Sequence, residues 1–288
     1  MALTINTNSM ALNIQRNLAH NQKLLATSMH RLSSGTRVNS AKDDAAGVAI
    51  AERINIQIRG MNVAMRNAND GISLAQSAEG GLQEISSMLQ RMRELAIQSS
   101  NGTNSTSDRS NLDTEFQALN AEIGRIAQNT TFNGDAILNT SAVVSGGVTR
   151  DASVEFYVGP VADSANSLTI SLKKIETLTV TSGGVSGLAA GIAGIPGAGN
   201  AITAIDIMID DVTKARADFG AVQSRFQSTI NNLQVGLENQ SAARGRIMDA
   251  DFAVESANLA KAQILRQAGN AMLSHANAAP QSVLSLLT

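Results

Sequence analysis

One apolar stripe, from Ile54 to Ala96, constrains the fold of this chain more than any other feature. Its members follow one another at steps of three or four residues: Ile54, Ile58, Met61, Met65, Ala68, Ile72, Ala75, Ala78, Leu82, Ile85, Leu89, Met92 and Ala96. Because one turn of an α-helix takes about 3.6 residues, such steps keep all these side chains on one narrow face of one helix. At about 1.5 Å per residue the stripe is roughly 60 Å long. It predicts a helical rod that needs packing partners along its full length.

Glycine interrupts this helix at positions 60, 71, 80 and 81, always off the stripe. Each glycine is expected to weaken the helix by about 1 kcal/mol relative to alanine.

The composition suits slender helical seams and excludes several classes of site. Six Phe, one Tyr and no Trp leave few large rings for a compact core, and the absence of Cys excludes disulfides and thiolate metal sites. The net charge of −2, with Lys and Arg spread among acids, argues against a nucleic-acid surface. We see no secretory signal at the N-terminus and no stretch long enough to span a membrane.

The first 35 residues are predicted to need a second surface. They place Ile14, Leu18, Leu25, Met29 and Leu32 on one helical face. The conformational entropy lost on ordering such a segment exceeds what its few apolar side chains return on burial. Alone, this segment is expected to be disordered or fraying.

A polar connection at residues 33–40 separates this segment from the long helix, which we expect to open near Ala41 with Asp43 and Asp44 at its positive end. The turn-forming residues 101–105 should end the long helix. A third helix is then predicted from a further stripe that stops before residues 131–134: Leu112, Phe116, Leu119, Ile123 and Ile126.

The apolar period then changes to two residues, which predicts a β-hairpin. One strand holds Val154, Phe156 and Val158, the other holds Leu168, Ile170 and Leu172, and a further strand segment could cover 178–180. Between residues 183 and 199 glycine is so frequent that we expect a flexible connector or a loose loop.

Two helical patterns complete the chain and mirror its first half. The longer stripe comprises Ile202, Ile205, Ile209, Val212, Phe219, Val222, Phe226, Ile230, Leu233 and Leu237. The final segment, Phe252 to Leu273, carries Leu259, Ile264, Leu265, Ala268 and Met272. We therefore predict a mainly α fold, a long antiparallel helical hairpin or coiled-coil bundle with a small β-hairpin region in the middle of the chain. The first stripe would pack on Ile202–Leu237 and Leu112–Ile126.

Two long segments, one near each end, carry a resemblance to a known family. Residues 32–47 (LSSGTRVNSAKDDAAG) and the tail (AQILRQAG at 262–269, then PQSVLSLL at 280–287) resemble the signatures of bacterial flagellin. Residues 132–134 (FNG) and 219–223 (FGAVQ) match as well, so the resemblance covers about residues 1–140 and 200–288. Large flagellins carry outer domains in the middle of the chain, and this sequence resembles a short form without them.

The resemblance implies three regions. Residues 1–40 and 250–288 would form an inner coiled-coil domain, residues 41–140 and 200–249 a helical-bundle domain, and residues 141–199 a reduced variable region. It also implies a structural subunit that polymerises with itself into the extracellular flagellar filament used for swimming. The chain would be exported in the unfolded state through the flagellar type III apparatus. Its partners would be an export chaperone, the filament cap and hook-junction proteins. Nucleic acid, membrane insertion and a cofactor are not expected.

The segment from Gln90 to Gln98 resembles the flagellin segment that the animal Toll-like receptor for flagellin recognises. The residues that the resemblance assigns to this recognition are Gln90, Arg91, Arg93, Glu94, Leu95, Gln98 and Glu115. Arg91 and Leu95 flank the stripe and are expected to be partly exposed, on a surface that meets neighbouring subunits. The alternative is that the charged members form ordinary solvated or inter-subunit ion pairs, which contribute little.

The terminal segments are predicted to serve polymerisation and chaperone binding. Their assigned residues are Ile14, Leu18, Leu25, Leu32, Leu265, Met272, Val283, Leu284, Leu286 and Leu287. A segment buried only after polymerisation is available beforehand to a chaperone or to cytosolic immune sensing, which the resemblance also implies.

No catalytic or metal site is predicted. The three histidines are scattered at 20, 30 and 275, and no His-Glu-x-x-His motif occurs. The adjacent acids Asp43-Asp44 and Asp210-Asp211 point about 100° apart on a helix, so caps or solvated faces are expected. The alternatives to a filament subunit are a hook–filament junction protein of the same export system and an adhesin, against which the small middle region argues.

Overall fold

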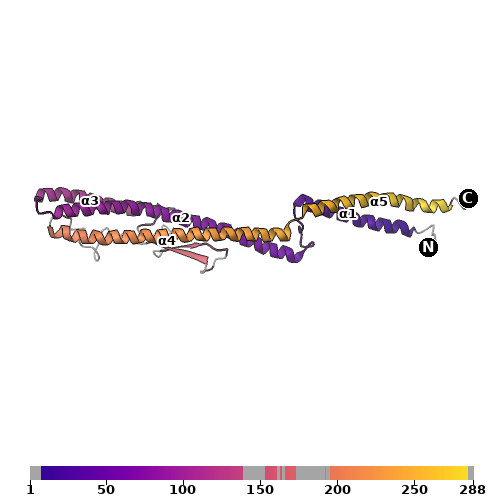
Figure 1. Ribbon diagram of the computed structural model, residues 1–288, viewed down its shortest axis with the longest axis horizontal. Coiled ribbons are helices and arrows are strands. Elements are labelled where there is room, and N and C mark those ends of the chain that lie inside the picture. Colours follow the sequence, from indigo (N-terminus) through magenta and orange to yellow (C-terminus); the bar gives the residue numbers. More distant parts are fainter. Residues whose placement is uncertain are drawn as a thin grey trace. The chain divides into compact units, whose positions relative to one another are not determined.

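The computed structural model describes residues 8–138, 153–160, 163, 166–172, 192 and 195–284, with side chains omitted at 195–197 and 279–284. The chain divides into two compact units (Figure 1). One comprises Met1–Gln57 with Glu238–Thr288, and the other comprises Ile58–Leu237. The fold is mainly α with small antiparallel hairpins, as predicted from the sequence.

The first unit is built on two helices, α1 (Ser9–Ser34) and α5 (Phe252–Leu284), which lie side by side (Figure 1). They run antiparallel, because Asn8 Nδ2 donates to the carbonyl of Ala276 at one end and Ser28 Oγ donates to Glu255 at the other. Gly35 ends α1 with a φ of 71°, a left-handed conformation that glycine adopts without strain.

The seam between α1 and α5 follows a heptad pattern, with alternating steps of three and four residues. On α1 the residues that face α5 are Ala11, Ile14, Leu18, Asn21, Leu25, Ser28 and Leu32. On α5 the buried and half-buried residues are Glu255, Leu259, Ala262, Gly269, Leu273 and Ala276. A Cβ atom on Gly269 would lie 2.8 Å from Leu18 Cδ1, so small residues on α5 let large ones from α1 approach closely.

Met29 does not join this seam, contrary to the sequence prediction. Its side chain is 55% exposed, whereas the neighbouring Ser28 is buried. The heptad steps select positions 25, 28 and 32, and residue 29 is turned by about 100° from residue 28. The prediction for Ile14, Leu18, Leu25 and Leu32 as one face is confirmed.

The connection after α1 is tied by backbone hydrogen bonds to residues 248–250, which precede α5. Arg37 N donates to Met248 O over 2.6 Å, and Ala250 N donates to Gly35 O over 3.0 Å, around an antiparallel bridge between Thr36 and Asp249. Helix α2 (Ala45–Ser100) begins four residues later than predicted. Asp44 caps it by accepting a hydrogen bond from Gly47 N, so this acid is a cap as expected.

The second unit packs α2 against α3 (Thr106–Asn129) and α4 (Ile195–Met248). The stripe of α2 is half-buried at its start and fully buried from Leu82 to Ala96. Phe116 and Ile123 of α3 and Phe226 of α4 belong to the same buried cluster. The structure therefore confirms both predicted partners of the stripe.

Three of the four off-stripe glycines of α2 make room for other elements. A Cβ atom on Gly60 would lie 2.8 Å from Pro160 O, one on Gly71 would lie 2.6 Å from the Phe226 ring, and one on Gly81 would lie 2.7 Å from Leu138 Cδ1. Gly80 has nothing within 4 Å. The cost in helix propensity is therefore offset by close packing at three of the positions.

The predicted hairpin is present as β3 (Ser153–Tyr157) and β4 (Ser167–Ser171), which pair antiparallel. Phe156 packs edge-on against Phe226 of α4, with ring centroids 5.6 Å apart. Asn67 of α2 donates to Tyr157 O over 2.8 Å. The further strand segment expected at 178–180 lies outside the described residues.

A second hairpin, β1 (Thr131–Phe132) with β2 (Asp135–Ala136), was missed by the sequence analysis. Asn133 and Gly134 form its turn with φ angles of 52° and 86°. Two positive φ angles in a two-residue loop define the turn type that Asn-Gly favours. The Asn-Gly pair was therefore the signal that could have predicted it.

Most of the predicted flexible connector, residues 183–199, lies outside the described residues, but Ile192 is anchored in the core. Its side chain is fully buried, its N–H donates to Asp113 Oδ1 over 2.7 Å, and its carbonyl accepts from Ser99 Oγ over 2.6 Å. The expectation of a loose connector is wrong at this residue, because one apolar side chain and two hydrogen bonds hold it against α2 and α3. The helix α4 also begins earlier than expected, at Ile195.

Candidate functional site

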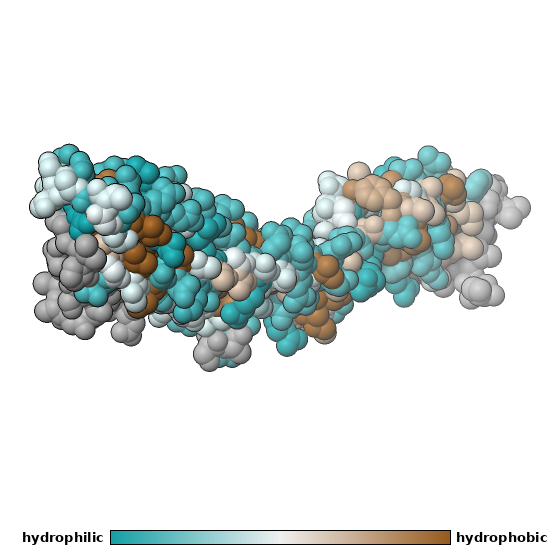
Figure 2. All heavy atoms as spheres, turned by 60° about the vertical axis from the view of Figure 1, so that its left-hand side comes forward, coloured by the Kyte–Doolittle hydropathy of each residue, from teal (hydrophilic) through white to brown (hydrophobic). Residues whose placement is uncertain are grey.

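The most extensive candidate site is an apolar surface on the first unit, which we call the outward surface. It consists of large hydrophobic side chains of α1 and α5 that lie off the seam: Met10, Leu12, Leu24, Met29, Phe252, Val254, Ile264, Leu265 and Met272. Brown spheres mark apolar residues at the surface of this unit in Figure 2. Ile264 is 65% exposed and Phe252 is 59% exposed.

The residues assigned to polymerisation fall into two groups. Ile14, Leu18, Leu25 and Leu32 lie half-buried in the α1–α5 seam, whereas Leu265 and Met272 belong to the outward surface. Val283 and Leu284 lie on the last turn of α5, and Leu286 and Leu287 lie outside the described residues. Residue spacing does not distinguish the two groups, because both follow the period of a helix.

An outward surface of this kind can associate with another protein. Soluble proteins rarely expose contiguous apolar patches, and large ones mark protein or membrane interaction sites. Among the described residues, no helix combines the length and apolar character that a bilayer crossing requires. The seam holds the two helices together, and the residues around it remain available for contacts outside the unit.

The seam also contains an ion pair at its loop end, between the buried carboxylate of Glu255 and the half-buried Arg31. Glu255 is 6% exposed, and its carboxylate accepts from Arg31 Nη1 over 2.8 Å and from Ser28 Oγ over 2.9 Å. The Arg31 hydrogen bond lowers the pKa of Glu255 despite the opposing effect of burial, with further help from Ser28 and Asn258. The carboxylate is therefore charged and has partners on both oxygens.

The segment assigned to receptor recognition forms a charged surface on α2 and α3. Arg91 Nε donates to Glu115 Oε1 over 3.0 Å and Arg91 Nη1 donates to Glu94 Oε2 over 3.1 Å. These carboxylates raise the pKa of Arg91, with Glu115 the larger cause. Arg93 pairs instead with Asp206 of α4 over 2.6 Å. The structure thus brings Arg91, Glu94 and Glu115 together and places Arg93 in a separate pair.

Leu95 does not lie on this surface, contrary to the expectation of partial exposure. Its side chain is 1% exposed and belongs to the core cluster of the second unit. Residue 95 follows Met92 by three positions and precedes Ser99 by four, so all three share the buried face of α2. Gln90 and Gln98 are exposed, as the surface interpretation requires.

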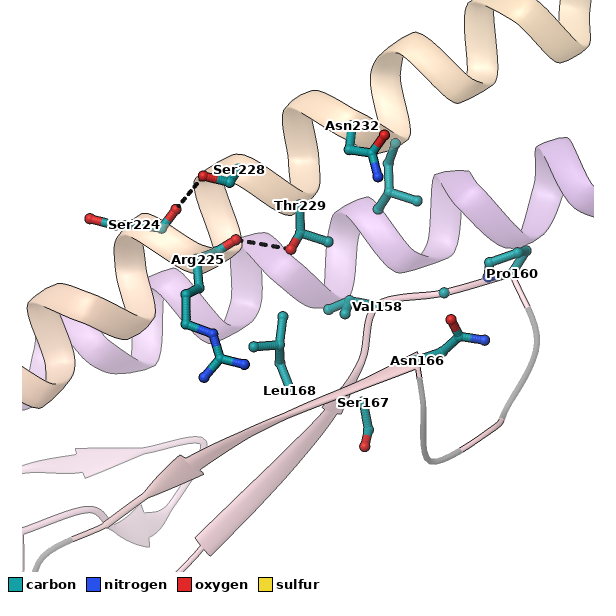
Figure 3. Close-up of a pocket in the computed structure, with 12 residues that line it drawn as sticks. Val158, Pro160, Asn166, Ser167, Leu168, Ser224, Arg225, Ser228, Thr229 and Asn232 are labelled. Carbon is teal, nitrogen blue, oxygen red and sulfur yellow. Dashed lines mark hydrogen bonds between the residues drawn. The ribbon is translucent and has the colours of Figure 1, made fainter.

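A cleft of about 620 Å³ lies between the β3–β4 hairpin and α4 (Figure 3). Its wall on α4 includes Arg225, Ser228 and Thr229. Both hydroxyls donate to carbonyls of their own helix, to Ser224 O and Arg225 O respectively. Within the described part of the chain, no group of three His, Asp or Glu residues could hold a metal ion. The cleft therefore presents one cation and no arrangement typical of catalysis.

Comparison with known proteins identifies the family of the chain. Residues 5–142 match the pattern described as the bacterial flagellin N-terminal helical region, and residues 202–287 match the bacterial flagellin C-terminal helical region. A flagellin of Halalkalibacterium halodurans is 43% identical, over 99% of this chain and 100% of the relative. Flagellin D of Vibrio cholerae is 36% identical, over the full length of both chains.

Among solved structures, a putative flagellar hook-associated protein from Vibrio parahaemolyticus has a similar fold. It superposes with a TM-score of 0.60 at 17% identity, over 72% of this chain and 100% of that protein. At this identity the likeness concerns the fold alone. The two terminal matches and the full-length relatives together lead to one conclusion: this chain belongs to the bacterial flagellin family.

Proposed function

We propose that this chain polymerises into the flagellar filament through the outward surface of α1 and α5. Members of its family are structural subunits of that extracellular filament, which serves motility. The observation that carries the proposal is that large hydrophobic side chains lie exposed around a helix pair whose own seam is already packed. Contacts with further copies of the chain would cover them.

This proposal assigns a structural role to each of the three regions inferred from the sequence. Residues 1–40 and 250–288 would supply the inner coiled-coil domain, residues 41–140 and 200–249 the helical-bundle domain, and residues 141–199 the reduced variable region. The heptad seam supports the first assignment, and the buried cluster shared by α2, α3 and α4 supports the second.

Seeded polymerisation tests the proposal. Purified chain mixed with filament fragments is expected to grow long filaments, visible by electron microscopy. Ile264→Asn, on the outward surface, should abolish growth, because it places an amide where apolar contacts form. Ser256→Asn, an exposed polar exchange on the same helix, should grow like the parent chain. Equal growth of both variants would contradict the role of the outward surface, and growth limited to short caps would favour a junction protein.

Export and partners extend this proposal. We expect export in the unfolded state through the flagellar type III apparatus, with an export chaperone, the filament cap and hook-junction proteins as partners. A strain that lacks the apparatus should retain the protein inside the cell. A mutant that loses adhesion but still swims would instead favour the adhesin alternative.

Receptor recognition is a second proposal, and the charged surface around Arg91 supports it. Free chain with Arg91→Ala should signal less through the animal flagellin receptor, since the substitution removes the group that links Glu94 and Glu115. Arg125→Ala is a matched control, because Arg125 is also exposed and paired within α3 to Glu122. Unchanged signalling by Arg91→Ala would contradict the proposal. Leu95 is unsuitable for this test, because its replacement would disturb the core.

A further inference from the structure

The steric pattern of the α1–α5 seam repeats itself every seven residues. On α1, large side chains recur at Leu18, Leu25 and Leu32. On α5, small residues recur at the same interval, at Ala262, Gly269 and Ala276. Each leucine therefore has a small residue opposite it in more than one alignment of the two helices. A slide of one heptad, roughly 10 Å, would bring Leu25 opposite Gly269 in place of Leu18.

Packing alone therefore selects the register only weakly. Antiparallel coiled coils whose core pattern repeats can pair in several alignments, and a polar group at a single core position is the feature known to fix one of them. Asn21 and Ser28 are uncharged polar members of the α1–α5 seam, and Glu255, whose carboxylate is buried, is the one charged residue among its described core positions.

Glu255 has its partners in one register only. In the observed alignment, Arg31 and Ser28 bind its two oxygens. Seven residues earlier on α1, these positions are held by Leu24 and Asn21, so a slide in that direction leaves the carboxylate without a cation. A slide in the other direction moves Glu255 past the end of α1 at Ser34.

We propose that Glu255, with Arg31 and Ser28, is the register lock of the terminal coiled coil. A buried charge that loses its partner is strongly destabilising, whereas a buried pair adds little over apolar side chains of similar size. The cluster therefore disfavours slipped pairings more than it favours association. This inference rests on the proposed function, because the register decides which residues of α1 and α5 lie together on the outward surface.

The backbone bridge between Thr36 and Asp249 lies at the same end of the seam and is the competing explanation for the register. Its hydrogen bonds join main-chain groups, which neighbouring residues also possess. A test must therefore remove the side-chain cluster and leave the bridge in place.

Disulfide trapping provides this test, because the chain has no cysteine of its own. Leu18→Cys with Gly269→Cys reports the observed register, and Leu25→Cys with Gly269→Cys reports the register slipped by one heptad. Disulfides need Cα atoms within about 7 Å, so each pair closes in its own register only. Intramolecular cross-links are read on non-reducing gels, in seeded filaments and in unassembled chain. Unassembled chain also gives a ratio from the fraction of molecules in which α1 and α5 pair, so failure of the parent chain to polymerise counts against the proposed function alone.

The parent chain should cross-link the in-register pair and not the slipped pair. Arg31→Leu with Glu255→Leu removes the cluster and leaves no lone charge, and it should lower the ratio of in-register to slipped cross-links by at least about tenfold. The charge swap Arg31→Glu with Glu255→Arg should restore much of the ratio. Lys23→Leu, at an exposed cation of α1, should leave it unchanged.

Two results would overturn the proposal. An unchanged ratio in the double leucine variant would show that the backbone bridge is sufficient for register. Loss of both cross-links in that variant would show that the cluster is needed for the helix contact itself and not for its alignment.

Discussion

At the scale of single residues, the glycines of α2 provide a matched pair for a stability test. Gly80→Ala should raise the free energy of unfolding by up to about 1 kcal/mol, because the site is exposed and has nothing within 4 Å. Gly71→Ala should lower it, because the new methyl group would meet the buried ring of Phe226. Chemical denaturation followed by circular dichroism measures both. A Gly71→Ala variant as stable as Gly80→Ala would contradict the packing argument.

The ionisation of Glu255 gives a second prediction at this scale. In the folded state its pKa lies below the ordinary glutamate value of about 4.5, chiefly because of the hydrogen bond from Arg31. As pH falls, this carboxyl group therefore takes up a proton in the unfolded chain before it does so in the folded chain. Its contribution to stability is fully present above the pKa that it has in the unfolded chain, and it is lost as pH falls through the lower pKa of the folded chain.

Thermal melting of assembled protein at several pH values measures this effect against Glu255→Gln, which cannot ionise. The parent should melt at a higher temperature than the variant at neutral pH, and the difference should shrink in acid below the ordinary carboxyl pKa. Melting temperatures that differ by the same amount at every pH would show that charge is not involved.

At the scale of elements, Ile192 joins a segment between β4 and α4 to the helical core. Ile192→Ala should lower the free energy of unfolding by about 2–5 kcal/mol, the range for truncating a fully buried isoleucine. Ile97→Ala on α2 is the matched control, because Ile97 is 46% exposed and its truncation should change stability by about 0.5 kcal/mol or less. Equal effects of the two substitutions in denaturant unfolding would mean that Ile192 does not anchor the segment.

Elements also show where local sequence signals succeed. Alternation of apolar residues predicted β3 and β4, and the spacing of Phe116, Ile123 and their neighbours predicted α3. The β1–β2 hairpin is only two residues per strand, so it has no alternation to detect, and its signal is confined to Asn133-Gly134.

At the scale of the whole molecule, the two units should differ in stability. The first unit relies on one seam between two helices and exposes many apolar side chains, whereas the second has a continuous core of three helices and a hairpin. Local opening follows such differences in buried contacts. Backbone amides of α1 and α5 should therefore exchange hydrogen rapidly in the free chain and slowly in filaments, whereas those around Phe116 and Phe226 should be protected in both. Hydrogen exchange with mass spectrometry checks this, and strong protection of α1 in the free chain would contradict it.

The sequence by itself determined the helices, their apolar stripes and the family of the chain. These features are local or repeat along the chain: a stripe with steps of three and four residues specifies a helix whatever it packs against. The sequence could not determine whether individual side chains near the edge of a stripe are buried or exposed. Leu95 and Met29 are both apolar residues at such positions, and only packing shows that the first is buried and the second exposed.

Tertiary structure alone decided which long-range partners meet. The pairing of Arg31 with Glu255, the anchoring of Ile192 by Ser99 and Asp113, and the closeness of Gly71 to Phe226 all join positions far apart in the sequence. No periodicity encodes such contacts, because each depends on how the helices are aligned along their axes. Spacing within a helix fixes the face that a residue occupies, and only the register between helices fixes what lies opposite to it.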